Sequence, residues 1–199
     1  MSSLVLFGSL ETDEVLQSLL QKDDDRTSYL LSQALMQYPL GKPVLANYLL
    51  DQLLASKNLF AVTANNQQIL PTSLIQAAAA EIQFLQQLVQ DYAEPAWLAD
   101  SAHAEIQHGN EYYQEIAQQF AGWPQQIPTE VVKTMHRFHQ QHGFGSLVRH
   151  RVWRWQGRLV GVAHPDPIRL EDLIGYQYQK QMIIQKTEFF LYHNRGNNV

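Results

Sequence analysis

Apolar residues recur at steps of three and four through most of the first 142 residues, and this spacing restricts the fold more than any other feature. The clearest run covers residues 73–92. Its apolar positions share one face of a helix and are Leu74, Ala78, Ile82, Leu85, Val89 and Tyr92. Ser73 and Gln76 have the S-x-x-Q spacing of a capping box at its start. We therefore predict a mainly α chain with a helical N-terminal region.

Proline and glycine divide this helical region into segments. Pro39 ends one apolar run, Pro43 stands where a first helical turn tolerates proline, and Gly143 is a typical helix stop. The further predicted helices cover residues 26–38, 44–56, about 104–120 and 128–142. The N-terminal helical region is therefore expected over residues 1–142.

The sequence changes character after Gly143. VWRW and RLVGV, rich in β-branched and aromatic residues, flank a Gln156–Gly157 turn and predict a short β-hairpin connector. Pro165 and Pro167 then indicate an extended linker. We assign residues 143–167 to hairpin and linker, and residues 168–199, with a helix over about 176–192, to a separate unit.

Composition excludes several classes of protein. The 199 residues include no cysteine, so disulfides, cysteine nucleophiles and thiolate metal sites are excluded. With a net charge of −5 the chain has no general attraction to nucleic acid or anionic membranes. No apolar run approaches the roughly 20 residues of a membrane span, and the N-terminus lacks a basic signal-peptide start. We expect a soluble cytoplasmic protein, with neither a membrane nor nucleic acid as its partner.

The stretch HPDPIRLEDLIGYQYQKQMIIQKTEFFLYHNRGNNV, residues 164–199, resembles the segment that opens an AAA+ ATPase module. It is most similar to bacterial AAA+ P-loop ATPases of uncharacterised type, in which a helical N-terminal region and a GxG…RW…HPDPI connector precede the ATPase core. Gly143, Gly145, Arg154 and Trp155 stand ahead of HPDPI in the same order. The resemblance implies that residues 168–199 hold the first helix of an incomplete α/β AAA+ module.

The resemblance also implies a nucleotide site. In AAA+ proteins the backbone near the Leu-Ile-Gly element lines the adenine pocket. The residues that would form this wall here are Asp172, Leu173, Ile174, Gly175 and Tyr176. ATP and Mg²⁺ are the cofactors implied for the complete parent protein. The alternative is that the glycine only forms a turn that caps a helix.

A P-loop sequence, G-x-x-x-x-G-K-[ST], is absent from these residues. Gly41-Lys42 is followed by Pro43 and has no glycine five residues before it. We therefore predict no catalytic residue, no cofactor held by this chain and no competence for ATP hydrolysis. Asn198–Val199 are expected to begin the core strand, in a chain truncated just before the Walker A loop.

Three histidines, His136, His139 and His142, suggest a metal site by their spacing. On a helix, however, the first and last would point about 120° apart. We therefore predict no metal site there and expect histidines that are exposed or at the edge of the core.

Arginines alternate with aromatic residues from Arg149 to Trp155. On a strand, Arg149, Arg151, Trp153 and Trp155 would share one face. Such a face could stack on single-stranded nucleic acid, or the arginine stems could simply cover the rings. The acidic chain favours the second interpretation.

Two hypotheses of function follow. In the first, this is the partner-recognition or regulatory N-terminal region of an AAA+ ATPase, with an unknown protein partner and a homo-oligomer formed through the ATPase module. In the second, it is a stand-alone helical protein-interaction module without nucleotide binding.

Overall fold

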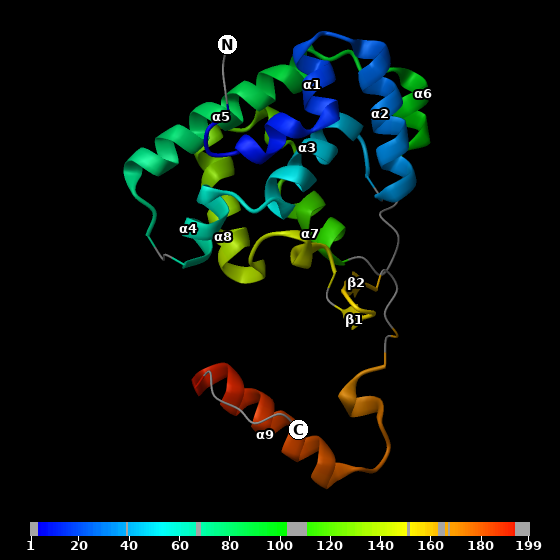
Figure 1. Cartoon of the computed structure of the whole chain (residues 1–199), viewed down its shortest axis with the longest axis vertical. Coiled ribbons are helices and arrows are strands. Elements are labelled where there is room, and N and C mark those ends of the chain that lie inside the picture. Colours follow the sequence, from blue (N-terminus) through cyan, green and yellow to red (C-terminus); the bar gives the residue numbers. More distant parts are fainter. Residues whose placement is uncertain are drawn as a thin grey trace. The chain divides into compact units, whose positions relative to one another are not determined.

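The chain is mainly α-helical with a short β-hairpin, as predicted (Figure 1). The computed structural model describes residues 4–38, 40–66, 69–102, 111–150, 152–162, 166 and 168–193. The chain divides into two compact units, Met1–His164 and Pro165–Val199. Four predicted features lie outside the described residues: the stop at Pro39, the first part of the helix expected over 104–120, the linker prolines Pro165 and Pro167, and the strand start at Asn198–Val199.

Helices form most of the first unit. They are α1 (Glu14–Leu20), α2 (Asp24–Gln37), α3 (Val44–Ala55), α4 (Leu59–Asn66), α5 (Thr72–Asp91), α6 (Ala96–Ser101), α7 (Glu111–Gln119) and α8 (Pro128–His142). Short 3₁₀ turns, η1 (Gly8–Thr12), η2 (Trp123–Gln125) and η3 (Ser146–Arg149), connect them. Helix α5 packs on α8, α4 packs on α8, and α1 packs on α2. The fully buried side chains between them include Phe7, Phe60, Trp123 and Phe138.

Two helix starts show how local chemistry sets the boundaries. The carboxylate of Asp23 accepts a hydrogen bond of 3.0 Å from the Arg26 N–H and so caps α2. The capping box expected at Ser73 is wrong, because α5 begins one residue earlier with Pro71 as its N-cap and no side-chain cap. Ser73 therefore lies inside the first turn, where its hydroxyl is not at the cap position.

Glu81, on α5, holds the N-terminal segment against the helices. Its Oε1 accepts hydrogen bonds of 2.9 Å from the N–H groups of Val5 and Leu6, and its Oε2 accepts one of 3.0 Å from Phe7. Phe7 is fully buried, so these bonds fix an apolar anchor as well as the backbone.

The predicted hairpin is confirmed. Strands β1 (Trp153–Trp155) and β2 (Leu159–Gly161) pair antiparallel around a turn in which Gly157 has a φ of +73°. At its base the His150 ring lies against Gly161. A Cβ at Gly161 would stand 2.1 Å from His150 Cδ2, so this close approach requires glycine.

In the second unit the structure describes a short 3₁₀ turn, η4 (Leu170–Asp172), and α9 (Gln177–His193). Most of its large apolar side chains are exposed. They are Ile168, Leu170, Leu173, Ile174, Tyr176, Tyr178, Ile183, Ile184, Phe189, Phe190 and Tyr192. These apolar side chains are thus not covered within the described part of the unit. No helix among the described residues has both the length and the apolarity to cross a membrane.

Candidate functional site

The five residues of the expected adenine wall lie in one turn between η4 and α9. Asp172 ends η4, and its Oδ2 accepts a hydrogen bond of 2.8 Å from the Arg169 N–H, which closes this short turn. Leu173 follows in an extended conformation, and the Ile174 side chain is 95% exposed. The structure therefore presents these residues as one continuous surface segment.

Two successive left-handed residues then redirect the chain into α9. Gly175 has a φ of +82° and Tyr176 a φ of +57°. Glycine adopts this conformation freely, whereas for tyrosine it is uncommon and needs support from its surroundings. Lys180 supports this conformation with two hydrogen bonds. Its N–H donates to the Tyr176 carbonyl over 2.9 Å, and its Nζ donates to the Leu173 carbonyl. The turn is thus tied to the first turn of the helix, with the Ile174 and Tyr176 side chains facing solvent.

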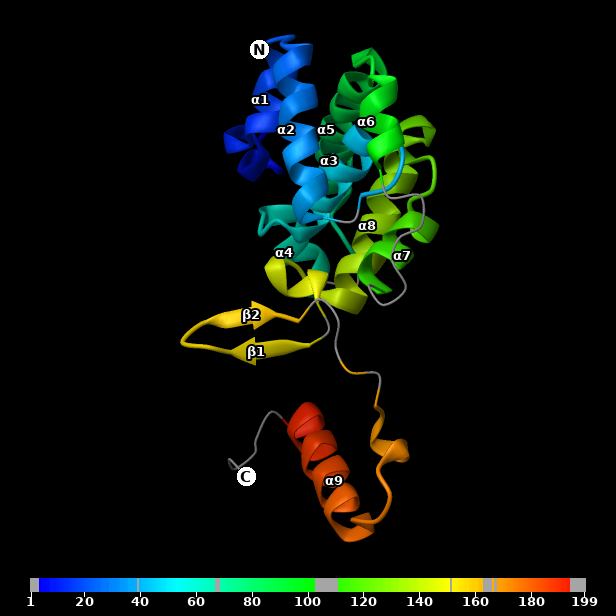
Figure 2. The ribbon, with the colours of Figure 1, turned by 90° about the vertical axis from the view of Figure 1, so that its right-hand side faces the viewer.

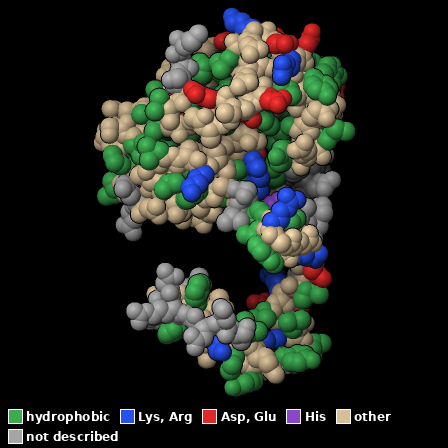
Figure 3. Space-filling model, in the orientation of Figure 1, with side chains coloured by type: hydrophobic (Ala, Val, Ile, Leu, Met, Phe, Trp, Pro, Cys, Tyr) green, Lys and Arg blue, Asp and Glu red, His purple; other side chains and the backbone are tan. Residues whose placement is uncertain are grey.

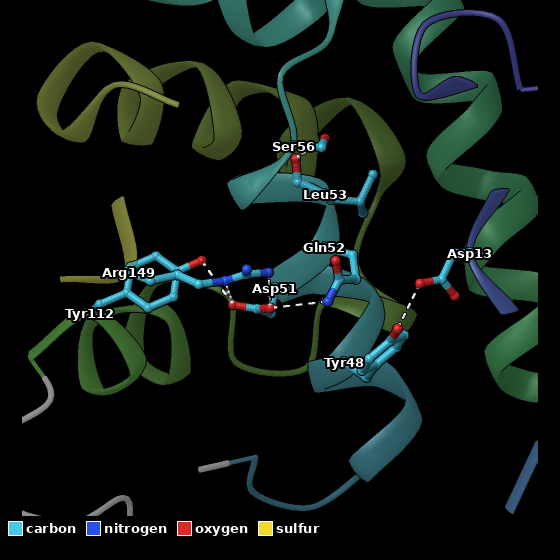
Figure 4. Close-up of polar contacts among 8 residues, drawn as sticks. All are labelled: Asp13, Tyr48, Asp51, Gln52, Leu53, Ser56, Tyr112 and Arg149. Atoms are coloured by element: carbon cyan, nitrogen blue, oxygen red, sulfur yellow. Dashed lines mark hydrogen bonds and ion pairs between the residues drawn. The ribbon is translucent and has the colours of Figure 1, made fainter. Parts of the chain in front are cut away.

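A second polar cluster, in the first unit, was not expected from the sequence. Asp51, on α3, is fully buried and forms a bidentate ion pair with Arg149 of η3 (Figure 4). Arg149 Nη2 lies 2.6 Å from Asp51 Oδ2, and Arg149 Nε lies 3.1 Å from Asp51 Oδ1. Such a two-point contact fixes both the position and the orientation of the guanidinium.

Tyrosines complete the surroundings of this ion pair. The Tyr112 hydroxyl, from α7, donates to Asp51 Oδ1 over 3.1 Å. The Arg149 guanidinium also lies 5.1 Å from the centre of the Tyr38 ring, a cation–π distance. Burial raises the pKa of the Tyr112 phenol well above its usual range, and the Asp51 charge raises it further. Burial lowers the pKa of Arg149, but the Asp51 charge and hydrogen bonds outweigh this and raise the pKa overall, so Arg149 stays charged and Tyr112 stays neutral.

Helix α3 carries a related contact one turn earlier. The Tyr48 hydroxyl donates to Asp13 Oδ2 over 2.6 Å (Figure 4), and Asp13 Oδ1 accepts from the Leu16 N–H over 2.9 Å. One carboxylate therefore caps α1 and joins it to α3. Burial, followed by the bond to Asp13, raises the pKa of Tyr48 above its usual range. These features indicate structural joints rather than reactive groups.

A small pocket beside the ion pair does not offer a ligand site. It has a volume of about 20 Å³ and is lined in part by Asp51, Tyr113 and Asn47. That volume is sufficient for about one water molecule. The cluster can therefore fix elements of the fold, but this pocket is too small for a nucleotide or peptide side chain.

The three spaced histidines of α8 have different surroundings. His139 is fully buried, against the expectation of an exposed or core-edge position, and its Nδ1 lies 2.8 Å from the Gly143 carbonyl. His142 Nε2 lies 3.0 Å from Glu115 Oε1 on α7. Among the described residues, no group of three His, Cys, Asp or Glu side chains is placed to hold a metal ion.

The prediction that Arg149 shares a strand face with Trp153 and Trp155 is wrong. Arg149 belongs to η3 and not to a strand, because its charge is paired with Asp51 inside the helical unit. Arg151 lies outside the described residues. Trp153 and Trp155 do share one face of β1, and Trp153 Nε1 donates to the His150 carbonyl over 2.8 Å.

One signal in the sequence could have pointed to the ion pair. Asp51 stands in the run VLANYLLDQLLA, among leucines that all predict burial. A carboxylate in such a position needs a cation or several hydrogen-bond donors. The sequence does not say which of its arginines is the partner.

The structure thus combines a helical unit with a hairpin connector, and the Arg149–Asp51 ion pair fixes the start of the connector to the helices. A family model described as "Protein of unknown function (DUF815)" matches residues 148–199. No curated protein and no solved structure matches the chain. The matched segment begins one residue before Arg149 and continues through the hairpin, the Asp172–Tyr176 turn and α9.

Proposed function

We propose that this chain is the partner-recognition and regulatory N-terminal region of an AAA+ ATPase of the cytoplasm, joined by the hairpin connector to the first helix of the ATPase module. The observation that carries the proposal is the place of the family match. It covers residues 148–199 and so includes residues 164–199, the stretch that resembles the AAA+ lead-in. In this proposal ATP and Mg²⁺ belong to the complete parent protein, which assembles through its ATPase module.

The exposed apolar residues of the second unit support this proposal. Ile174, Tyr178 and Phe190 are all more than half exposed, on a turn and a helix with apolar side chains on several sides. A helix of this kind is typical of the interior of a larger fold. Within an ATPase module such side chains would pack against a sheet and against the adenine ring.

The ion pair supports a regulatory link. Val148 is buried, and Arg149 is paired with Asp51, so the family-matched segment starts inside the helical unit. A partner that bound the helices and moved α3 would therefore also move the start of the connector, because Asp51 of α3 is paired with Arg149.

The test begins with the coding sequence that adjoins codon 199, read in all three frames. The proposal expects G-x-x-x-x-G-K-[ST] shortly downstream. A polypeptide extended through that motif should hydrolyse ATP and lose this activity when the motif lysine becomes alanine. Absence of the motif from every frame, or a motif that supports no hydrolysis, would exclude the ATPase proposal.

The five turn residues are tested in the same extended protein. Ile174→Ser should raise the KM for ATP, because it removes apolar cover from the base. Ile183→Ser is the matched control, since Ile183 is also an exposed isoleucine of this unit. Equal KM values for both variants would contradict the assignment of an adenine wall. The present chain alone, without phosphate contacts from a P-loop, should show no saturable binding of labelled ATP.

A second function, the stand-alone interaction module, is favoured by one observation. The helical unit buries its own core, with Phe7, Phe60, Trp123 and Phe138 enclosed by its own helices. A unit of this kind can bind a partner without a nucleotide-dependent domain. The adjoining coding sequence decides between the two, since this alternative expects no phosphate-binding motif there.

A further inference from the structure

The β-hairpin presents an exposed apolar pair. Trp155 is 72% exposed and Leu159 is 52% exposed. They are direct partners across the two strands, so their side chains lie next to each other on one face. Figure 2 shows the hairpin extending away from the helices of the first unit.

The hairpin carries positive charge. Arg154 and Arg158 are exposed, and residues 143–162 contain no Asp or Glu. Arg154 pairs with Val160 and therefore lies on the opposite face from Trp155, while Arg158 lies in the turn next to Leu159. The surface is thus an apolar anchor with Arg158 at its edge. Tryptophan with arginine at the rim is typical of protein–protein contacts.

Nucleic acid is a poorer fit to this arrangement. Stacking of single-stranded bases needs cations beside the ring, on the face that meets the backbone phosphates. Arg149 is committed to Asp51, and Arg154 lies on the other face from Trp155. The geometry favours a protein surface that is apolar at its centre and acidic around it.

The helical part of this same chain has the complementary charge. Residues 1–142 contain 15 Asp or Glu against 6 Lys or Arg. Figure 3 shows acidic side chains on the upper part of the visible face of the helical unit, with a few cations among them, and cations on the hairpin. We propose that Trp155 and Leu159 dock onto the acidic helical surface of a second copy of this chain, with Arg158 of the adjoining turn as the electrostatic rim.

Such a contact joins two different surfaces, so copies associate head to tail. One hairpin buries little area, and the association is therefore weak and depends on protein concentration. Salt weakens it further, because the charge of the exposed Arg158 at its edge is screened. The proposal does not depend on nucleotide or on the ATPase proposal.

Sedimentation equilibrium over a concentration series is the first test. The chain should self-associate, and Trp155→Ala should weaken the association constant by about 30-fold, as expected for an interface hot spot. Tyr178→Ala, at an exposed aromatic residue of α9 that lies in neither proposed surface, is the control and should leave it unchanged. Arg158→Glu should also weaken it, whereas Lys186→Glu, at an exposed lysine of α9, should not. A monomer at all concentrations, or equal effects of Trp155→Ala and Tyr178→Ala, overturns the proposal.

Crosslinking identifies the surface that receives the hairpin. Because the chain has no cysteine, Gln156→Cys in the exposed turn provides a single site for a photoreactive label. An equal mixture of isotopically heavy and light chains separates links between copies from links within one. Mass spectrometry should find the label of one copy on residues 1–142 of the other. Links from hairpin to hairpin, or only within one copy, overturn the head-to-tail contact.

A gel shift with a single-stranded oligonucleotide examines the competing ligand. The proposal expects Trp155→Ala to change self-association and not oligonucleotide binding. If that variant instead abolishes a salt-dependent gel shift and leaves sedimentation unchanged, the hairpin is a nucleic-acid surface and the proposal is overturned. Because Trp155 is exposed, circular dichroism should show the same helical content in the Trp155→Ala variant as in the unmodified chain.

Discussion

Arg149 and Asp51 are 98 positions apart in the sequence and share two hydrogen bonds, of 2.6 and 3.1 Å. Asp51 is fully buried, and the Arg149 side chain is 17% exposed. The contact joins α3 to η3 and so fixes the point at which the hairpin leaves the helical unit. The position of the hairpin thus depends on a charge inside the helical core.

Loss of one partner should be costly. Arg149→Met leaves the Asp51 carboxylate buried without its cation, and we expect the free energy of unfolding to fall by about 3 kcal/mol in urea titrations. Adding Asp51→Leu to this variant should restore part of the stability, because the buried charge is then gone. Lys42→Ala, which breaks the exposed Lys42–Asp100 pair, is the control and should cost less than about 1 kcal/mol. An Arg149→Met variant as stable as this control would contradict the assignment.

Acidification should destabilise the helical unit through His139. Its Nε2 has no hydrogen-bond partner within the described residues, and its ring lies between Phe60 of α4 and Phe138. Burial, then the neighbouring His136 and His142, lowers the pKa of His139 below the value of about 6.5 that a solvent-exposed histidine has. As the pH falls, His139 in the unfolded chain therefore binds a proton at a higher pH than His139 in the folded chain. Stability should therefore be complete above about pH 6.5 and be lost progressively as the pH falls toward the folded-state pKa.

The check is the urea midpoint measured from neutral to mildly acidic pH. His139→Gln should flatten the pH dependence, even if it lowers stability at every pH. His136→Gln, on the same helix, should keep most of the slope. An unchanged slope in His139→Gln would assign the acid sensitivity to other groups.

The N-terminal segment should loosen when Glu81 changes. Glu81→Gln replaces one carboxylate oxygen by an amide that donates, so at least one N–H of Val5, Leu6 or Phe7 loses its acceptor. We expect a loss of about 1–3 kcal/mol and faster hydrogen exchange of these three amides. Glu130→Gln, at an exposed carboxylate of α8, should alter neither quantity. Unchanged protection of residues 5–7 in Glu81→Gln would show that packing alone holds this segment.

The second unit should exchange its amide hydrogens faster than α5. The side chains of α9 are mostly exposed, so opening this helix uncovers little additional apolar surface. Opening α5 exposes Ala78, Ile82 and Leu85, which are fully buried. Hydrogen exchange followed by mass spectrometry compares the two peptides in one sample. Equal protection of both helices would mean that α9 is covered in solution, for example by another copy.

Sequence patterns predicted the local structure well where a single periodicity governs a segment. The run over residues 73–92 became α5, and the Gln156–Gly157 turn became the hairpin turn. The start of this helix was predicted wrongly, since Ser73 matched a capping box and yet lies within the helix. For the candidate nucleotide site, the sequence supplied the five residues and the structure supplied their left-handed turn. Their role stays a prediction.

The amino-acid sequence alone determined that this chain would be mainly helical with a hairpin after Gly143, because helix and turn preferences act over neighbouring residues. Only the tertiary structure decided that Arg149 leaves the strand to pair with Asp51, and that Trp155 remains exposed. A buried carboxylate such as that of Asp51 pairs with the cation that the packing of distant helices places beside it. That choice depends on three-dimensional proximity, which periodicity along the chain does not encode.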